Sequence, residues 1–108
     1  AGSYTFRYLG AVRRIPYSEI FCFSSDGHYT QILTEEGNFR QQEPLRKIFS
    51  YLPEQFHFCH RTAIVNIDHI TMLNGRELVL SNRMTLPVSL TYLQDIRDAL
   101  LSCVNSMR

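Results

Sequence analysis

The chain has 108 residues, which suits one domain with a single modest core. Its hydrophobic fraction of 44% and aromatic fraction of 12% are those of a folded globular protein and exclude a disordered chain. No apolar run approaches the roughly 18 residues that a membrane-spanning helix needs. The net charge of +1 does not by itself indicate nucleic acid, although ten of the eleven basic residues are arginine, whose planar fork suits guanine edges and phosphates.

The first three residues, Ala-Gly-Ser, look like a cloning remnant and not like a signal peptide. We therefore expect one domain over residues 4–108 that belongs to a longer chain. The three cysteines, Cys22, Cys59 and Cys103, lie far apart in the sequence. An odd number without framework spacing indicates reduced, mostly buried thiols and a cytoplasmic protein.

The first part of the chain alternates apolar and polar residues with a period of two, which predicts short strands. The expected strands cover residues 4–8, 11–15, 20–24, 28–34 and 39–42. A short helix over residues 45–52 follows, because Pro44 suits a first helical turn, the apolar residues recur at helical spacing, and Pro53 ends the pattern.

The second part begins with one or two strands in the stretch FHFCHRTAIVNIDHI, residues 56–70. Asn74-Gly75 then predicts a hairpin between residues 70–73 and 77–80, and Asn82-Arg83 predicts a second turn before residues 84–88.

Residues 90–107 are expected to form the last helix, capped by Ser89 or by a capping box that begins at Thr91. Its apolar stripe is Leu93, Ile96, Leu100, Cys103, Val104 and Met107. The predicted fold class is mainly β, with about ten short strands, one short helix and a C-terminal helix.

The segment 57–61 carries several side chains that could do chemistry. His57, Cys59 and His60 are metal-ligand types, but alternation along a strand lets at most two of them converge. Cys59 and His60 are neighbours and would point apart, which disfavours a catalytic dyad. The sequence also lacks a nucleophile elbow and a glycine-rich phosphate loop. We therefore expect no enzyme, no metal and no cofactor.

Nucleic-acid contact is the remaining chemical interpretation. His60-Arg61-Thr62 lies at a strand end, residues 25–28 form a polar turn, and Ser89-Leu90-Thr91 begins a helix whose free N–H groups suit a phosphate. From the residues alone, an arginine in a strand such as Arg61 is more often a surface charge, and histidines such as His28 and His60 are more often satisfied structural residues.

Taken in order, these landmarks resemble the LytTR DNA-binding domain of bacterial response regulators. The resemblance rests on Ile-Pro-Tyr-Ser-Glu-Ile at 15–20, Asp-Gly-His-Tyr at 26–29, His-Arg-x-x-Ile-Val-Asn at 60–66 and Leu-Pro-Val-Ser at 86–89. It spans roughly residues 5–101. Each piece is weak alone, but the ordered set is specific.

The resemblance implies an elongated stack of small antiparallel sheets whose loops enter two successive major grooves of double-stranded DNA. It also implies a cytoplasmic transcriptional regulator, the output domain of a two-component response regulator. Family members usually carry an N-terminal receiver domain and bind direct-repeat promoter sites as dimers. No membrane partner is expected.

Carried over by position, the resemblance implies a first contact loop at residues 24–29, with His28 as base reader beside Tyr29. Arg61 would reach a base and Thr62 a phosphate, and Ser89, Leu90 and Thr91 would form the third contact. Many members have arginine directly after the serine. Leu90 could touch only a thymine methyl, so Arg61, Arg83 or Arg97 compensates, or the site reads another base.

Two residues of the same segment are assigned to structure. Asn66 is expected to fix a turn, and Cys59 to fill the core. The alternative function is a protein–protein interaction module of the same fold, in which the near-neutral charge and Leu90 mark weakened or lost DNA binding.

Overall fold

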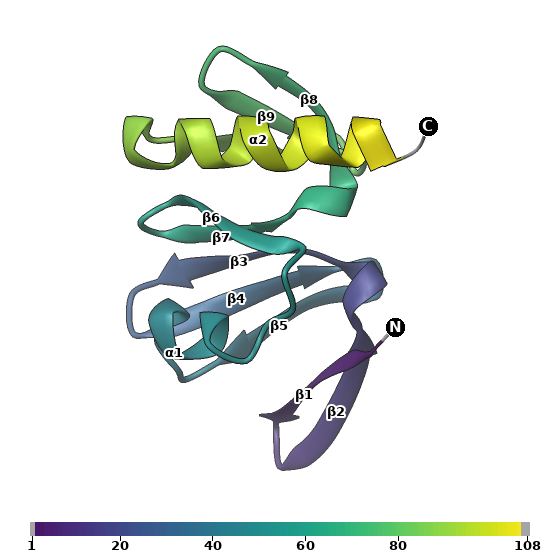
Figure 1. Cartoon of the computed structure of the whole chain (residues 1–108). Coiled ribbons are helices and arrows are strands. Elements are labelled where there is room, and N and C mark those ends of the chain that lie inside the picture. The colour runs from purple at the N-terminus through teal and green to yellow at the C-terminus, as the bar shows by residue number, and fades with distance from the viewer. Residues whose placement is uncertain (1, 107–108) are drawn as a thin grey trace.

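The computed structural model describes residues 2–106, with side chains up to residue 102. Within this part, small antiparallel sheets are stacked along the long axis of the molecule (Figure 1). The elements are β1 (Ser3–Tyr8), β2 (Ala11–Pro16), η1 (Tyr17–Glu19), β3 (Ile20–Asp26), β4 (Tyr29–Thr34), β5 (Gly37–Gln41), α1 (Leu45–Phe49), β6 (Phe56–His60), β7 (Ala63–Asn66), η2 (Ile67–His69), β8 (Ile70–Asn74), β9 (Glu77–Leu80), β10 (Thr85–Pro87) and α2 (Leu90–Ser106).

The central sheet has five strands in the order β5-β4-β3-β7-β6. The hairpin β1–β2 lies below it in Figure 1, and the sheet β10-β9-β8 lies above it together with α2. Every pair of neighbouring strands is antiparallel, and the molecule measures 42 × 30 × 25 Å. The predicted fold class, mainly β with a short helix and a C-terminal helix, is therefore confirmed.

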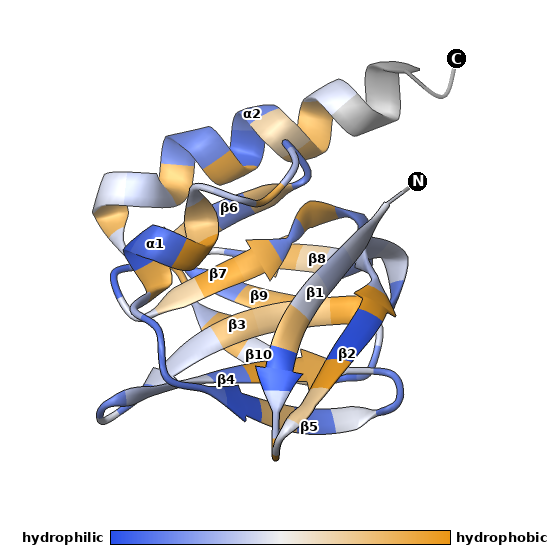
Figure 2. Cartoon of the chain, turned by 90° about the horizontal axis from the view of Figure 1, so that it is seen from below, coloured by the Kyte–Doolittle hydropathy of each residue, from blue (hydrophilic) through white to orange (hydrophobic). Residues whose placement is uncertain are grey.

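The two faces of the central sheet support two separate cores. Between the sheet, the β1–β2 hairpin and α1, the core is largely aromatic, and Tyr4, Phe6, Phe23, Phe39 and Phe56 meet there. Between the sheet, β8–β10 and α2, the core is mainly aliphatic. Hydrophobic residues are concentrated along β3 and β7, the strands covered on both faces (Figure 2).

Several local details differ from the sequence expectations. The first helix ends at Phe49 and not at residue 52, because the chain continues in single turns in which Leu52 N–H donates to Phe49 O. The 3₁₀ helices η1 and η2 were not predicted, since each is one turn long and has no periodic signal.

The last helix begins directly after Ser89, as one of the two predicted starts requires. The alternative prediction, a capping box that begins at Thr91, is wrong. Thr91 already lies inside the helix, and the Gln94 side chain donates forward to Asp98 and not back toward Thr91. Ile96 is buried, and Leu93 and Leu100 are half-buried, as the stripe predicted. Cys103, Val104 and Met107 lie outside the described side chains. No helix of the described residues is long and apolar enough to cross a membrane.

Candidate DNA interface

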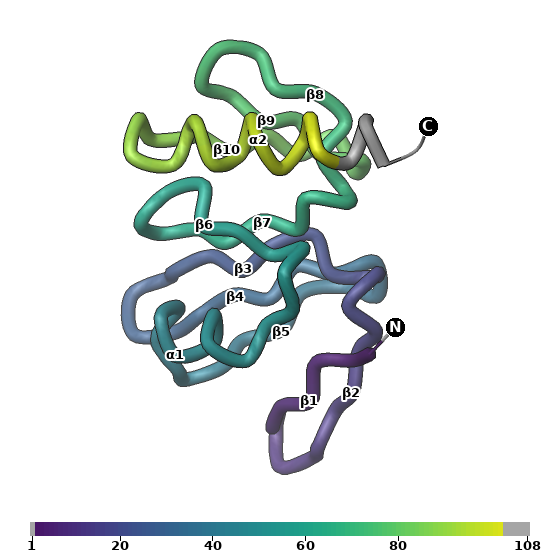
Figure 3. Tube along the Cα trace, in the orientation of Figure 1, coloured from purple at the N-terminus to yellow at the C-terminus, as the bar shows by residue number. Residues whose placement is uncertain are grey.

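Three exposed chain segments lie at one edge of the stack, on the left in Figures 1 and 3. They are the β3–β4 turn at residues 27–28, the β6–β7 turn at residues 61–62, and the start of α2. Ser25 N–H donates to Thr62 O at 2.9 Å, and Ser89 N–H donates to Cys59 O at 2.9 Å. These main-chain bonds join the first segment to the second and the second to the third. We call this set the three-tip edge.

The first tip is a tight turn between β3 and β4. Gly27 has a φ of 61°, which favours glycine at this position, and His28 beside it is exposed. Tyr29 is 38% exposed, and the Arg40 guanidinium lies 4.6 Å from the centre of its ring. Arg40 was missed in the sequence, because only the pairing of β4 with β5 brings it beside the first tip.

The second tip carries Arg61 at an exposed position. A shift of register between Phe58 and His60 distorts β6 just before the turn. Thr62 N–H donates to Nδ1 of His60 at 3.3 Å, and the Thr62 hydroxyl lies 2.8 Å from the same nitrogen. His60 therefore shapes the turn, and Arg61 extends from it into solvent.

The third tip combines the end of β10 with the first turn of α2. Leu90 is 70% exposed, Thr91 is exposed, and Ser89 is half-buried with its carbonyl accepting from Tyr92 N–H at 3.0 Å. Leu90 and Thr91 are therefore both accessible to solvent at this tip.

The two proposed substitutes for an arginine at this tip lie elsewhere. Arg83 lies in the β9–β10 turn, at the opposite end of β10 from Ser89. Ser81 N–H in the same turn donates to the carbonyl of His69 in η2. Arg97 lies farther along α2, in a groove shared with Leu73 and Gly75. Of the three arginines suggested as compensating, Arg61 is the one at the three-tip edge.

The metal-ligand types of β6 have separate partners. His57 Nδ1 lies 2.8 Å from Asp95 Oδ2 and ties β6 to α2, while His60 contacts Thr62. Cys59 is fully buried, and burial raises the pKa of its thiol to about 12. Its Sγ lies 3.8 Å from Ala63 O. A buried protonated thiol is a poor nucleophile, so Cys59 serves the core, as predicted.

Asn66 is fully buried and joins two 3₁₀ helices. Its amide nitrogen donates to Tyr17 O at 3.1 Å and to Ile20 O at 2.9 Å, at the two ends of η1. Its side-chain oxygen accepts from Asp68 N–H at 3.0 Å and caps η2. The structural role predicted for Asn66 is confirmed.

The structure is thus a mainly β domain with three exposed segments along one edge. The sequence matches the family model of the LytTr DNA-binding domain over residues 10–101. This chain therefore belongs to the LytTR family of DNA-binding domains.

A solved structure, the LytTr DNA-binding domain of a methyl-accepting/DNA response regulator from Bacillus cereus, has the same fold. It aligns with a TM-score of 0.78 and 24% identity, over 93% of this chain and 97% of that chain. A search of curated proteins gives no significant match.

Proposed function

We propose that this domain binds double-stranded DNA in a sequence-specific manner and regulates transcription as the output domain of a two-component response regulator. The observation that carries the proposal is the three-tip edge, in which main-chain hydrogen bonds hold three exposed polar segments in a row. Family membership supports DNA as the partner.

The proposed binding mode inserts loops into successive major grooves. One helical turn of DNA measures about 34–36 Å, which is comparable with the 42 Å length of the domain. The three tips occupy part of this length, and main-chain hydrogen bonds between neighbouring tips fix their spacing.

The seven residues assigned to this edge have different proposed roles. Arg61 donates to a guanine edge, since the residue is exposed in the turn between β6 and β7. His28 reads a base, and Tyr29 lies beside it. Thr62, Ser89 and Thr91 contact phosphates, whereas Leu90 contacts a thymine methyl.

The family resemblance also supports a proposal for the wider assembly. We propose that the domain acts in the cytoplasm, follows a receiver domain in the full-length chain, and binds direct-repeat promoter sites as a dimer. In direct repeats both copies have the same orientation, so the two domains would contact neighbouring sites through the same three tips.

Selection from a random duplex library tests this function. We expect enrichment of a short motif in direct repeat, with an affinity that falls steeply as salt is raised. The absence of any enriched motif would contradict sequence-specific binding and would favour the alternative, a protein–protein interaction module. The exposed Leu90, where many members have arginine, is the observation that favours the alternative.

A further inference from the structure

A groove of about 350 Å³ opens directly beside the second tip. Its lining residues come from α1, β6, the second tip and the first turn of α2. The groove is lined by Leu45, Arg46, Phe49, Phe58, Arg61 and Tyr92. Arg61 is thus a residue of both the groove and the second tip.

The walls of this groove are aromatic side chains that contact one another. The rings of Phe49 and Phe58 lie 4.8 Å apart, and the rings of Phe58 and Tyr92 lie 5.9 Å apart at an angle of 24°. These residues come from α1, β6 and α2, so the tertiary structure assembles the walls. Flat apolar walls of this kind can contact a sugar ring or a base.

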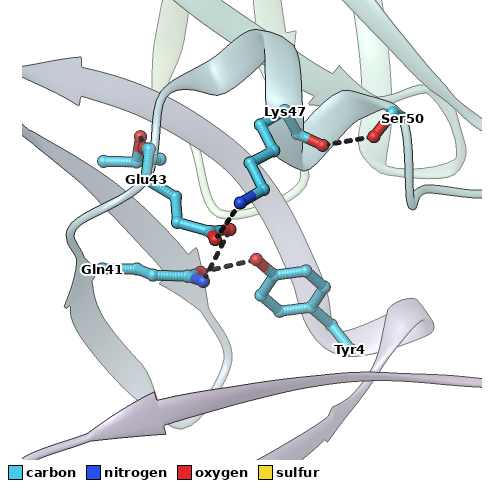
Figure 4. A network of polar contacts seen from close by, with 6 residues as sticks. Tyr4, Gln41, Glu43, Lys47 and Ser50 are labelled. Carbon is cyan, nitrogen blue, oxygen red and sulfur yellow. Dashed lines mark hydrogen bonds and ion pairs between the residues drawn. The ribbon is translucent and has the colours of Figure 1, made fainter.

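The charged side chains of the groove are both arginines, Arg46 and Arg61, and its lining contains no carboxylate. The acidic residue that precedes α1, Glu43, is engaged elsewhere. Its carboxylate lies 3.3 Å from the Lys47 amine and accepts from the Gln41 amide at 3.2 Å (Figure 4). Arg46 is exposed on the neighbouring position of α1 and leaves the groove positively charged.

We propose that this groove holds the sugar–phosphate backbone of the DNA strand that flanks the base read by Arg61, and that Arg46 binds a phosphate there. The inference rests on the proposed function and extends its interface beyond the three tips to α1. A strand that reaches Arg61 at the tip has a continuous path into the groove, because the same side chain lines both. Phosphate contacts carry no sequence information, so Arg46 supplies affinity and Arg61 supplies specificity.

The test measures binding of the selected duplex and of a shuffled duplex over a series of salt concentrations. Arg46→Ala should weaken binding to both duplexes by the same factor, roughly tenfold, since it removes one charged hydrogen bond. It should also lower the slope of log affinity against log salt by about 0.9. Arg46→Lys should recover most of the affinity, because a phosphate accepts either cation.

Arg14→Ala is the matched control. Arg14 is also exposed but lies on the β1–β2 hairpin, below the central sheet in Figure 1, and its removal should leave affinity and salt slope unchanged. Ethylation interference on the unaltered protein adds a test without a variant. It should locate a sensitive phosphate beside the base assigned to Arg61, and that sensitivity should disappear in Arg46→Ala.

The outcomes separate the inference from the proposed function. If the unaltered protein binds its motif and Arg46→Ala behaves like Arg14→Ala, the groove does not hold DNA and the proposed function remains. A loss confined to the selected duplex would also overturn the phosphate assignment, because it indicates base reading. If the unaltered protein binds no duplex, the proposed function fails and the inference fails with it.

Discussion

The two ends of the β6–β7 hairpin carry polar side chains in very different surroundings. At the turn, Arg61 and Thr62 are exposed at the three-tip edge. At the open end, Asn66 is fully buried and bonded to main-chain groups of η1 and η2. The two ends are only a few residues apart in the chain, yet one end faces solvent and the other holds the fold together.

This difference teaches that residue type alone does not separate binding from structure in this segment. Burial with a full set of partners makes a polar residue structural, since its loss leaves main-chain groups without partners. Exposure at a turn that the main chain holds in place leaves a side chain available to a ligand. A substitution at the buried end should therefore lower stability, whereas a substitution at the exposed end should lower DNA affinity and leave stability unchanged.

The largest effect is expected at the buried end. Asn66→Ala should reduce the free energy of unfolding by about 3 kcal/mol, because it removes three side-chain hydrogen bonds to main-chain groups, of which the bond to Ile20 O is buried. Urea unfolding followed by circular dichroism measures the loss. Asp68→Ala is the control, since Asp68 is exposed and contributes its backbone N–H, which the substitution keeps. If Asn66→Ala is as stable as the unaltered protein, Asn66 does not have the structural role that distinguishes it from Arg61.

At the exposed end, we expect a loss of DNA affinity with little change in stability. Arg61→Ala should lower affinity for the selected duplex by about 1–3 kcal/mol while changing stability by less than about 0.5 kcal/mol. A gel shift and a thermal melt measure the two quantities. Arg7→Ala, an exposed arginine on β1, should change neither. Unchanged specific binding by Arg61→Ala would remove Arg61 from the interface.

The buried thiols extend the comparison to Cys59, two residues before Arg61. Burial raises the pKa of Cys22 and of Cys59 to about 12 in the folded state, above the thiol value of 9.0. The unfolded chain loses these protons first, so their contribution to stability is complete below pH 9 and declines as pH rises toward 12. As pH rises from 8 to about 9.5, the two thiols together should lower the free energy of unfolding by about 1–2 kcal/mol.

Urea unfolding at several pH values measures this decline, and Cys59→Ala should reduce its slope by about half. Both cysteines should also resist thiol reagents until the protein unfolds. Rapid modification of Cys59 in the folded protein would show that this thiol is accessible and not buried in the core below the second tip.

The smallest effect is expected at a hairpin tip outside the three-tip edge. Leu9 and Gly10 connect β1 and β2 with φ values of 50° and 80°, and Leu9 is 87% exposed. Asparagine tolerates this left-handed conformation better than leucine, so Leu9→Asn should stabilise the protein by about 0.5 kcal/mol. Thermal melts measure the gain, and DNA affinity should remain the same. A loss of affinity would extend the interface to this hairpin.

Much of the fold was predictable because its signals are local. Alternation with a period of two located the strands, and Asn74-Gly75 located the turn between β8 and β9. The presence of η1 and η2 was not predictable, since these single turns depend on the side-chain bonds of Asn66. The end of α1 was not predictable either, because the chain continues past Phe49 in single turns held by main-chain bonds. The residues of the site were suggested by resemblance to a family, while Arg40 and Arg46 had no local signal.

The sequence by itself determined the order of strands and helices, the family, and the positions of two polar turns and of the start of the last helix. Only the tertiary structure decided that these turns lie along one edge and that a groove with Arg46 continues from it. The physical reason is distance along the chain. The bonds between Ser25 and Thr62 and between Ser89 and Cys59 join segments that are far apart in sequence, and hydrophobic periodicity carries no information about which turns become neighbours.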